Sequence, residues 1–132
     1  HGYVPCDRGR NLPSHRLSVV GECEAVQWAF ALLRKKAVIG NLDEPLFNGF
    51  VGWDDVDNCF ALRKAGWKIM YDGLGVGYHS PRATRGRDDE EAAQMNFENA
   101  KVFWKRWGYW EQYVKATGYQ EKEPEKVEFK EE

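Results

Sequence analysis

The sequence predicts a mixed α/β domain in which two long helices pack against a few short strands. Residues 54–65 and 89–107 place apolar side chains at helical spacing, and a glycine follows each segment. Residues 67–71 form a short apolar segment between Gly66 and a glycine-spaced stretch, which predicts a strand. The chain has 132 residues, 42% of them hydrophobic, so we expect one domain with a core of its own.

The N-terminal third of the chain predicts less regular structure. Residues 1–17 contain glycine, proline and asparagine with little periodicity, which indicates an extended loop. Residues 22–33 are dense in apolar side chains, and this pattern is compatible with a buried strand or with a helix. Gly40 and Asn41 predict a turn, and Pro45 ends any helix before it.

The segment 54–65 is the clearest helix in the sequence. Three aspartates open it, where negative charge suits the positive end of the helix dipole, and Gly66 ends it. Its apolar side chains at helical spacing are Val56, Cys59, Phe60 and Leu62.

The remaining elements follow the predicted strand. Residues 80–87 form a polar, basic loop, and Asp88 is a suitable N-cap for the helix 89–107. Gly108 ends this helix, and residues 109–116 are expected to add one or two further helical turns. The side chains available for the buried face of the long helix include Met95, Val102 and Phe103.

Composition and charge exclude some classes of function. The formal net charge of −2 gives no electrostatic basis for binding nucleic acid, and no apolar run is long enough to span a membrane. Three cysteines without metal-type spacing favour neither a disulfide framework nor a zinc site, and reduced thiols fit a cytoplasmic protein. Any membrane association at the cytoplasmic face is expected to come through a longer parent protein. Residues 119–132 are highly charged, so we expect a disordered tail after a domain of residues 1–118.

Several short motifs follow one another across the middle of the chain. In order they are Leu32-Leu33-Arg34-Lys35, Gly40-Asn41-Leu42-Asp43-Glu44, Trp53-Asp54-Asp55-Val56-Asp57, Arg63-Lys64-Ala65-Gly66-Trp67, Tyr78-His79 and Ala83-Thr84-Arg85-Gly86. In this order and spacing they resemble the C-terminal, acceptor-side half of a GT-A fold glycosyltransferase of family 2. The resemblance covers about half of the chain and implies a partial GT-A fold, with a short mixed sheet and flanking helices.

The resemblance implies transfer of a sugar from a nucleotide-sugar donor to a glycan, lipid or protein acceptor, as in polysaccharide biosynthesis. Such a transfer needs a base for the acceptor hydroxyl and a divalent metal, Mn²⁺ or Mg²⁺, for the departing nucleoside diphosphate. The family's base corresponds to Asp55, with Asp54 beside it. A helix N-terminus lowers the pKa of a carboxylate, so we expect Asp55 to be ionised. The alternative is that Asp54, Asp55 and Asp57 only cap the helix.

The resemblance assigns further residues to the donor and the acceptor. His79 corresponds to a histidine that joins the metal in related enzymes, although a lone histidine is often only a hydrogen-bonded surface group. Arg82 and Arg85 lie in a loop expected to close over the diphosphate, because guanidinium groups pair with phosphate oxygens; the alternative is an ordinary solvated loop. The candidates for contact with the acceptor are Trp53, Asp43 and Glu44. For Asp43 and Glu44, a role in the turn or at a helix N-terminus is equally compatible with the sequence.

Two classes of function remain open on the sequence. One is a glycosyltransferase fragment, and the other is a non-catalytic carbohydrate- or protein-binding module built on the same scaffold. The family's nucleotide-binding half and its Asp-x-Asp metal motif have no counterpart in the sequence, so we expect the isolated chain to be inactive. Without that half, strand edges and apolar surface are expected to be exposed, which favours a homodimer.

Overall fold

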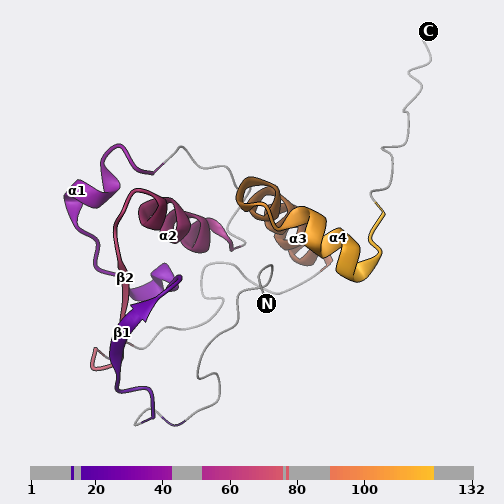
Figure 1. Cartoon of the computed structure of the whole chain (residues 1–132). Helices are drawn as coiled ribbons and strands as arrows, with labels where there is room; N and C mark the ends of the chain where they lie inside the picture. The colour runs from indigo at the N-terminus through magenta and orange to yellow at the C-terminus, as the bar shows by residue number, and fades with distance from the viewer. Residues whose placement is uncertain (1–12, 14–15, 43–51, 76, 78–89, 121–132) are drawn as a thin grey trace, which may run out of the picture.

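The computed structural model describes Pro13 and residues 16–42, 52–75, 77 and 90–120. Within these residues the elements are β1 (Val20–Cys23), the 3₁₀ helix η2 (Trp28–Phe30), α1 (Lys35–Val38), α2 (Asp54–Lys64), β2 (Ile69–Asp72), α3 (Glu90–Trp107) and α4 (Trp110–Thr117). Figure 1 shows α2 between the two strands and α1 on one side and the pair α3 and α4 on the other. This arrangement confirms the predicted α/β class.

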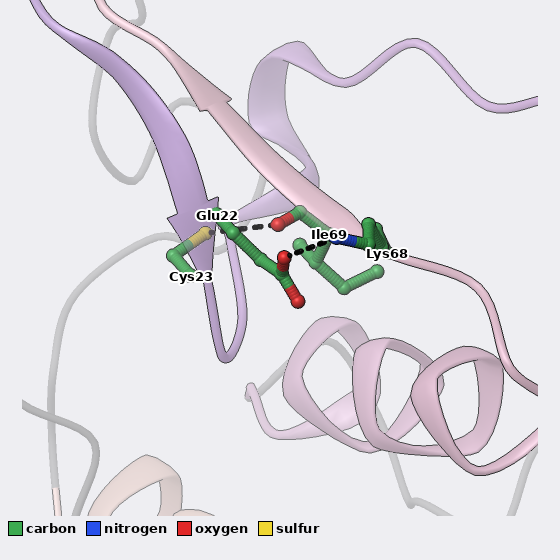
Figure 2. A network of polar contacts seen from close by, with 4 residues as sticks. All are labelled: Glu22, Cys23, Lys68 and Ile69. Carbon is green, nitrogen blue, oxygen red and sulfur yellow. Dashed lines mark hydrogen bonds and ion pairs between the residues drawn. The ribbon is translucent and has the colours of Figure 1, made fainter.

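The sheet of the described residues has two antiparallel strands, where the sequence predicted a short mixed sheet. The register places Val20 opposite Asp72 and Cys23 opposite Ile69. At one end of the pair, the Lys68 ammonium donates to a Glu22 carboxylate oxygen at 2.9 Å, and the Cys23 thiol lies 3.8 Å from the Ile69 carbonyl oxygen (Figure 2). Because this ion pair is exposed, it contributes little, and the strands depend on packing against α2.

The strand predicted at residues 67–71 is confirmed, with its start shifted to Ile69. The shift comes from the end of α2. Gly66 adopts a left-handed conformation with a φ of 88°, and the Trp67 N–H donates to the Leu62 carbonyl oxygen at 3.0 Å. Trp67 therefore belongs to the termination of the helix, and the chain becomes extended only after it.

Neither a buried strand nor an α-helix spans the apolar run at residues 22–33, so the prediction of a single element there is wrong. Strand β1 ends at Cys23, and a single 3₁₀ turn, η2, follows. Only the first part of the run packs inward, through Ala25, Val26 and Trp28. Phe30 is 75% exposed and Leu32 is fully exposed, so the second half of the run lies on the surface.

Helix α2 confirms the helix predicted at residues 54–65, and it is buried on two faces. On one face, Cys59 and Leu62 join Ala37 and Ile69 in a small core, which we call the β-side core. On the other face, Val56 and Phe60 pack against α3 in an aromatic core centred on Ala100, Phe103 and Trp104. Helix α2 is therefore the element that connects the two cores.

The aromatic core extends through α4. The rings of Trp104 and Tyr113 stack with centroids 4.4 Å apart, and Tyr119 contacts Phe97 at 5.3 Å. Gly108 separates the two helices with a φ of 77°, which confirms the predicted break and the predicted further turns. From residue 121 on, the predicted tail lies outside the described residues.

Only part of the predicted buried face of α3 is correct. Phe103 is 2% exposed, as predicted, whereas Val102 is 37% exposed and Met95 is half-buried. The buried stripe instead follows Asn99, Ala100, Phe103 and Trp104, which are spaced by three and four residues. Val102 therefore lies outside that stripe. Its apolar side chain suggested burial, but its position on the helix places it on the exposed side.

Exposed apolar side chains gather around β1, η2, α1 and β2. The described part of the chain therefore has exposed apolar side chains, and their link to a missing donor half and the expected homodimer stay predictions. The large hydrophobic residues exposed there are Val19, Val20, Phe30, Leu32, Leu33, Ile39, Met70, Tyr71 and Leu74.

Candidate functional site

The candidate site lies at the N-terminal end of α2, where the backbone is strained. Gly52 and Trp53 both have positive φ, 60° and 76°, and Trp53 is the one such residue other than glycine in the described ranges. A left-handed conformation costs a residue with a Cβ about 1–2 kcal/mol. Such strain persists only where surrounding contacts hold it, and it gathers at functional sites.

Contacts with α3 hold Trp53 in this conformation. Its indole Nε1–H donates to Asn96 Oδ1 at 3.0 Å. Its ring lies against Phe103 and Trp104, with centroids 5.2 and 5.5 Å apart. The ring is half-buried in the aromatic core, and the predicted contact of Trp53 with an acceptor stays a prediction.

Asp55 is the half-buried carboxylate of the site. Its Oδ1 accepts the Val56 N–H at 2.8 Å. Burial raises the pKa of Asp55 above its ordinary value, and the charge of Asp54 adds to the rise; the backbone N–H groups of Val56 and Trp28 oppose it. The predicted lowering of the Asp55 pKa is therefore wrong, because desolvation outweighs the helix N-terminus and the hydrogen bonds.

Asp54 and Asp57 occupy the same turn but have different surroundings. Asp54 is exposed, whereas Asp57 is 4% exposed. Asp57 Oδ1 accepts the indole Nε1–H of Trp107 at 2.6 Å, and Oδ2 pairs with Arg106 at 3.2 Å. Asp57 thus joins α2 to the end of α3.

The role of Asp57 was missed in the sequence, where it was treated as one of three capping aspartates. The available signal was its position three residues before Phe60, on the side of α2 that faces the aromatic core. The capping alternative does not account for Asp57, whose hydrogen bond and ion pair reach α3. It accounts for Asp55 in part, since that carboxylate binds a backbone N–H of the first turn.

The remaining predicted site residues lie outside the described residues, and their roles stay predictions. Within the described ranges, no group of three or more histidine, cysteine or acidic side chains is arranged to hold a metal ion. The expected divalent metal therefore stays a prediction as well. The predicted residues outside the description are Asp43, Glu44, His79, Arg82 and Arg85.

Comparisons of the chain with models of protein families, with curated proteins and with solved structures find no match. Among the helices that the structure describes, none is long and apolar enough to cross a membrane.

Proposed function

We propose that this chain carries the acceptor side of a glycosyltransferase site, with Asp55 as the general base. The observation that carries the proposal is the position of Asp55. It is a half-buried carboxylate with a raised pKa, two residues after a tryptophan held in a strained conformation. A raised pKa at Asp55 and a strained backbone at Trp53, within one short segment, favour a functional role for Asp55 over a capping role.

The order of motifs supports the type of reaction. The acidic pair, the glycine break after α2 and the strand that follows occur in the order found in family 2 glycosyltransferases. In such a transfer Asp55 takes the proton of the acceptor hydroxyl while that oxygen forms a bond to the anomeric carbon of the donor sugar. The bond from this carbon to the diphosphate oxygen breaks, and the nucleoside diphosphate leaves with the electron pair. A raised pKa makes Asp55 a stronger proton acceptor for this step.

Asp54 has a supporting role in the proposal. Its negative charge lies beside Asp55 and contributes to the raised pKa of that group. Because Asp54 is exposed, its own carboxylate remains well solvated. We therefore assign proton transfer to Asp55 and an electrostatic effect to Asp54.

The experiment measures sugar transfer by the native-length protein that contains this chain, supplied with a panel of nucleotide sugars. Release of the nucleoside diphosphate reports turnover. Asp55→Asn keeps the shape of the side chain but removes the proton acceptor, so turnover is expected to fall by roughly 10²–10⁴. Donor affinity is expected to change little, because the donor is held by residues outside α2.

Asp54→Asn is the matched control, since it removes a charge from the same turn without removing the base. It is expected to reduce turnover much less than Asp55→Asn. Turnover near that of the wild type in Asp55→Asn would contradict the proposal. Transfer by the 132-residue chain alone would contradict the need for a separate donor-binding half.

A further inference from the structure

A groove at the opposite end of α2 is separate from the candidate catalytic carboxylate. It has a volume of about 490 Å³, within the range of small-molecule sites. Ala61 and Lys64 line it, six and nine residues after Asp55, which corresponds to roughly 9–14 Å along the helix. The other lining residues are Gly40, Asn41, Ala65, Arg106 and Trp107.

Small residues leave this space open. Gly40, Ala61 and Ala65 come from the turn after α1 and from the end of α2, and none has a side chain beyond Cβ. A Cβ added at Gly40 would meet nothing within 4 Å. Because Ala61 itself lines the groove, a larger side chain there is expected to occupy part of it, which provides a way to block the groove.

The charges that line the groove are positive. Lys64 and Arg106 contribute two cations, and no acidic residue is among the described residues that line it. The carboxylate of Asp57 pairs with Arg106 and offsets one of the two charges. The same carboxylate accepts the indole N–H of Trp107, so the positions of Arg106 and Trp107 are fixed together.

The side-chain amide of Asn41 and the C-terminal end of α2 also lie at the groove. The Asn41 amide is held by its bond to the Ala37 carbonyl oxygen at 2.9 Å. The C-terminal end of α2 carries partial negative charge, which opposes an anion. Because the carbonyl oxygens at this end of α2 cannot donate a hydrogen bond to an anion, attraction for an anion must come from the side chains of Lys64 and Arg106.

We infer that this groove binds a small oxyanion carried by a sugar-sized molecule, independently of the reaction proposed for Asp55. Ammonium and guanidinium groups supply charge-assisted hydrogen bonds to such an anion. The indole ring of Trp107, whose N–H is donated to Asp57, supplies an apolar wall for the rest of the ligand. The anion can be a phosphate or a carboxylate, since both accept these hydrogen bonds.

The test is a titration of the ¹⁵N-labelled full chain, followed by NMR, with three probes: glucose 1-phosphate, glucuronate and neutral glucose. The two anions separate the phosphate source from the carboxylate source, and glucose is the uncharged control. We expect saturable shifts of the Asn41, Lys64 and Ala65 amide signals with at least one anion, and a dissociation constant on the order of 1 mM. Binding by one anion alone identifies the source and supports the inference.

Two variants locate the binding, and a third is the control. Lys64→Gln is expected to weaken binding about tenfold, since it removes a charged donor. Ala61→Leu is expected to abolish binding by filling the groove. Lys115→Gln removes an exposed lysine of α4 away from the groove and is expected to change nothing.

Several outcomes would overturn the inference. They are the lack of saturable shifts with either anion, equal binding of glucose, and unchanged binding in Lys64→Gln. If Ala61→Leu fails to fold, Lys64→Gln still decides the question, because it changes a side chain on the exposed surface. None of these results depends on turnover, so they are distinguishable from a failure of the proposed glycosyl transfer.

Discussion

Asp57→Asn removes a buried negative charge that joins α2 to α3. The carboxylate is 4% exposed and binds Trp107 at 2.6 Å and Arg106 at 3.2 Å. A hydrogen bond to a charged group contributes about 1.5–3 kcal/mol, and loss of one partner of a buried ion pair costs about 3–5 kcal/mol. The Arg106 side chain is 25% exposed, so water compensates for part of this loss. We therefore expect the free energy of unfolding to fall by about 2–3 kcal/mol.

The assay is urea denaturation followed by tryptophan fluorescence, with the midpoint and the slope fitted separately. The slope is expected to stay constant, because the surface exposed on unfolding does not change. Asp54→Asn is the matched control from the same turn, and an exposed substitution is expected to stay within about 0.5 kcal/mol of the wild type. A loss in Asp57→Asn no larger than that of Asp54→Asn would refute the reasoning.

A double-mutant cycle isolates the hydrogen bond. Trp107→Phe removes the indole N–H while keeping an aromatic ring in the core. Because Asp57 and Trp107 are in direct contact, their coupling energy is expected to be about 0.5–3 kcal/mol. Additive effects of the two substitutions would contradict a direct contribution of this bond.

Three further predictions concern the cores, a helix end and titration. Phe103→Ala should destabilise the fold by about 3–5 kcal/mol in the same denaturation assay, whereas Val102→Ala on the exposed side should cost far less; equal losses would contradict the aromatic core. Gly66→Ala should cost about 1–2 kcal/mol because of its left-handed conformation, whereas Gly21→Ala should be near neutral; an unchanged melting temperature in Gly66→Ala would oppose this. The folded-state pKa of Asp55 is raised, so its stabilising contribution is complete below the unfolded-state pKa and is lost as pH rises through the folded-state pKa. Relative to the wild type, Asp55→Asn should therefore become more stable with rising pH over this window, and a pH-independent difference in melting temperature would contradict the raised pKa.

The sequence was sufficient to predict a helix where apolar residues recur at helical spacing and a glycine follows them. The sequence predicted α2 and α3 from apolar residues at helical spacing, and both Gly66 and Gly108 have positive φ in the structure. The strand β2 was also predictable, since a short apolar segment follows Gly66. These features depend on neighbours along the chain, which a sequence shows directly.

The prediction for the apolar run at residues 22–33 failed because hydrophobicity alone does not specify burial. The β-side core takes Cys23, Ala25, Val26 and Trp28 from this region, and α2 supplies Cys59 and Leu62 to the same core. The following residues have no described partner element to cover them, and Leu32 is fully exposed. Their exposure depends on which elements lie opposite, and a local pattern contains no such information.

The position of Asp54 and Asp55 at the start of α2 was predictable, whereas the electrostatics of that turn were not. Asp54 and Asp55 open α2 as expected from the acidic pair. The pKa of Asp55 rises rather than falls because burial by the surrounding elements exceeds the local effect of the helix N-terminus. The partner of Asp57 lies 50 residues away along the chain, so the spacing to Phe60 indicates which side of α2 carries Asp57 but not which residue it contacts.

Contacts with α3 restrain the turn of α2 that carries Asp55. Two indole N–H groups hold the start of α2: Trp53 donates to Asn96 on α3, and Trp107 of α3 donates to Asp57. Asp55 lies midway between Trp53 and Asp57, so both bonds restrict the turn that carries it. The contact at Trp53 also maintains the left-handed backbone immediately before the acidic pair. Helix α3 therefore stabilises the strained start of α2 and restrains the turn that carries the carboxylate that we propose as the base.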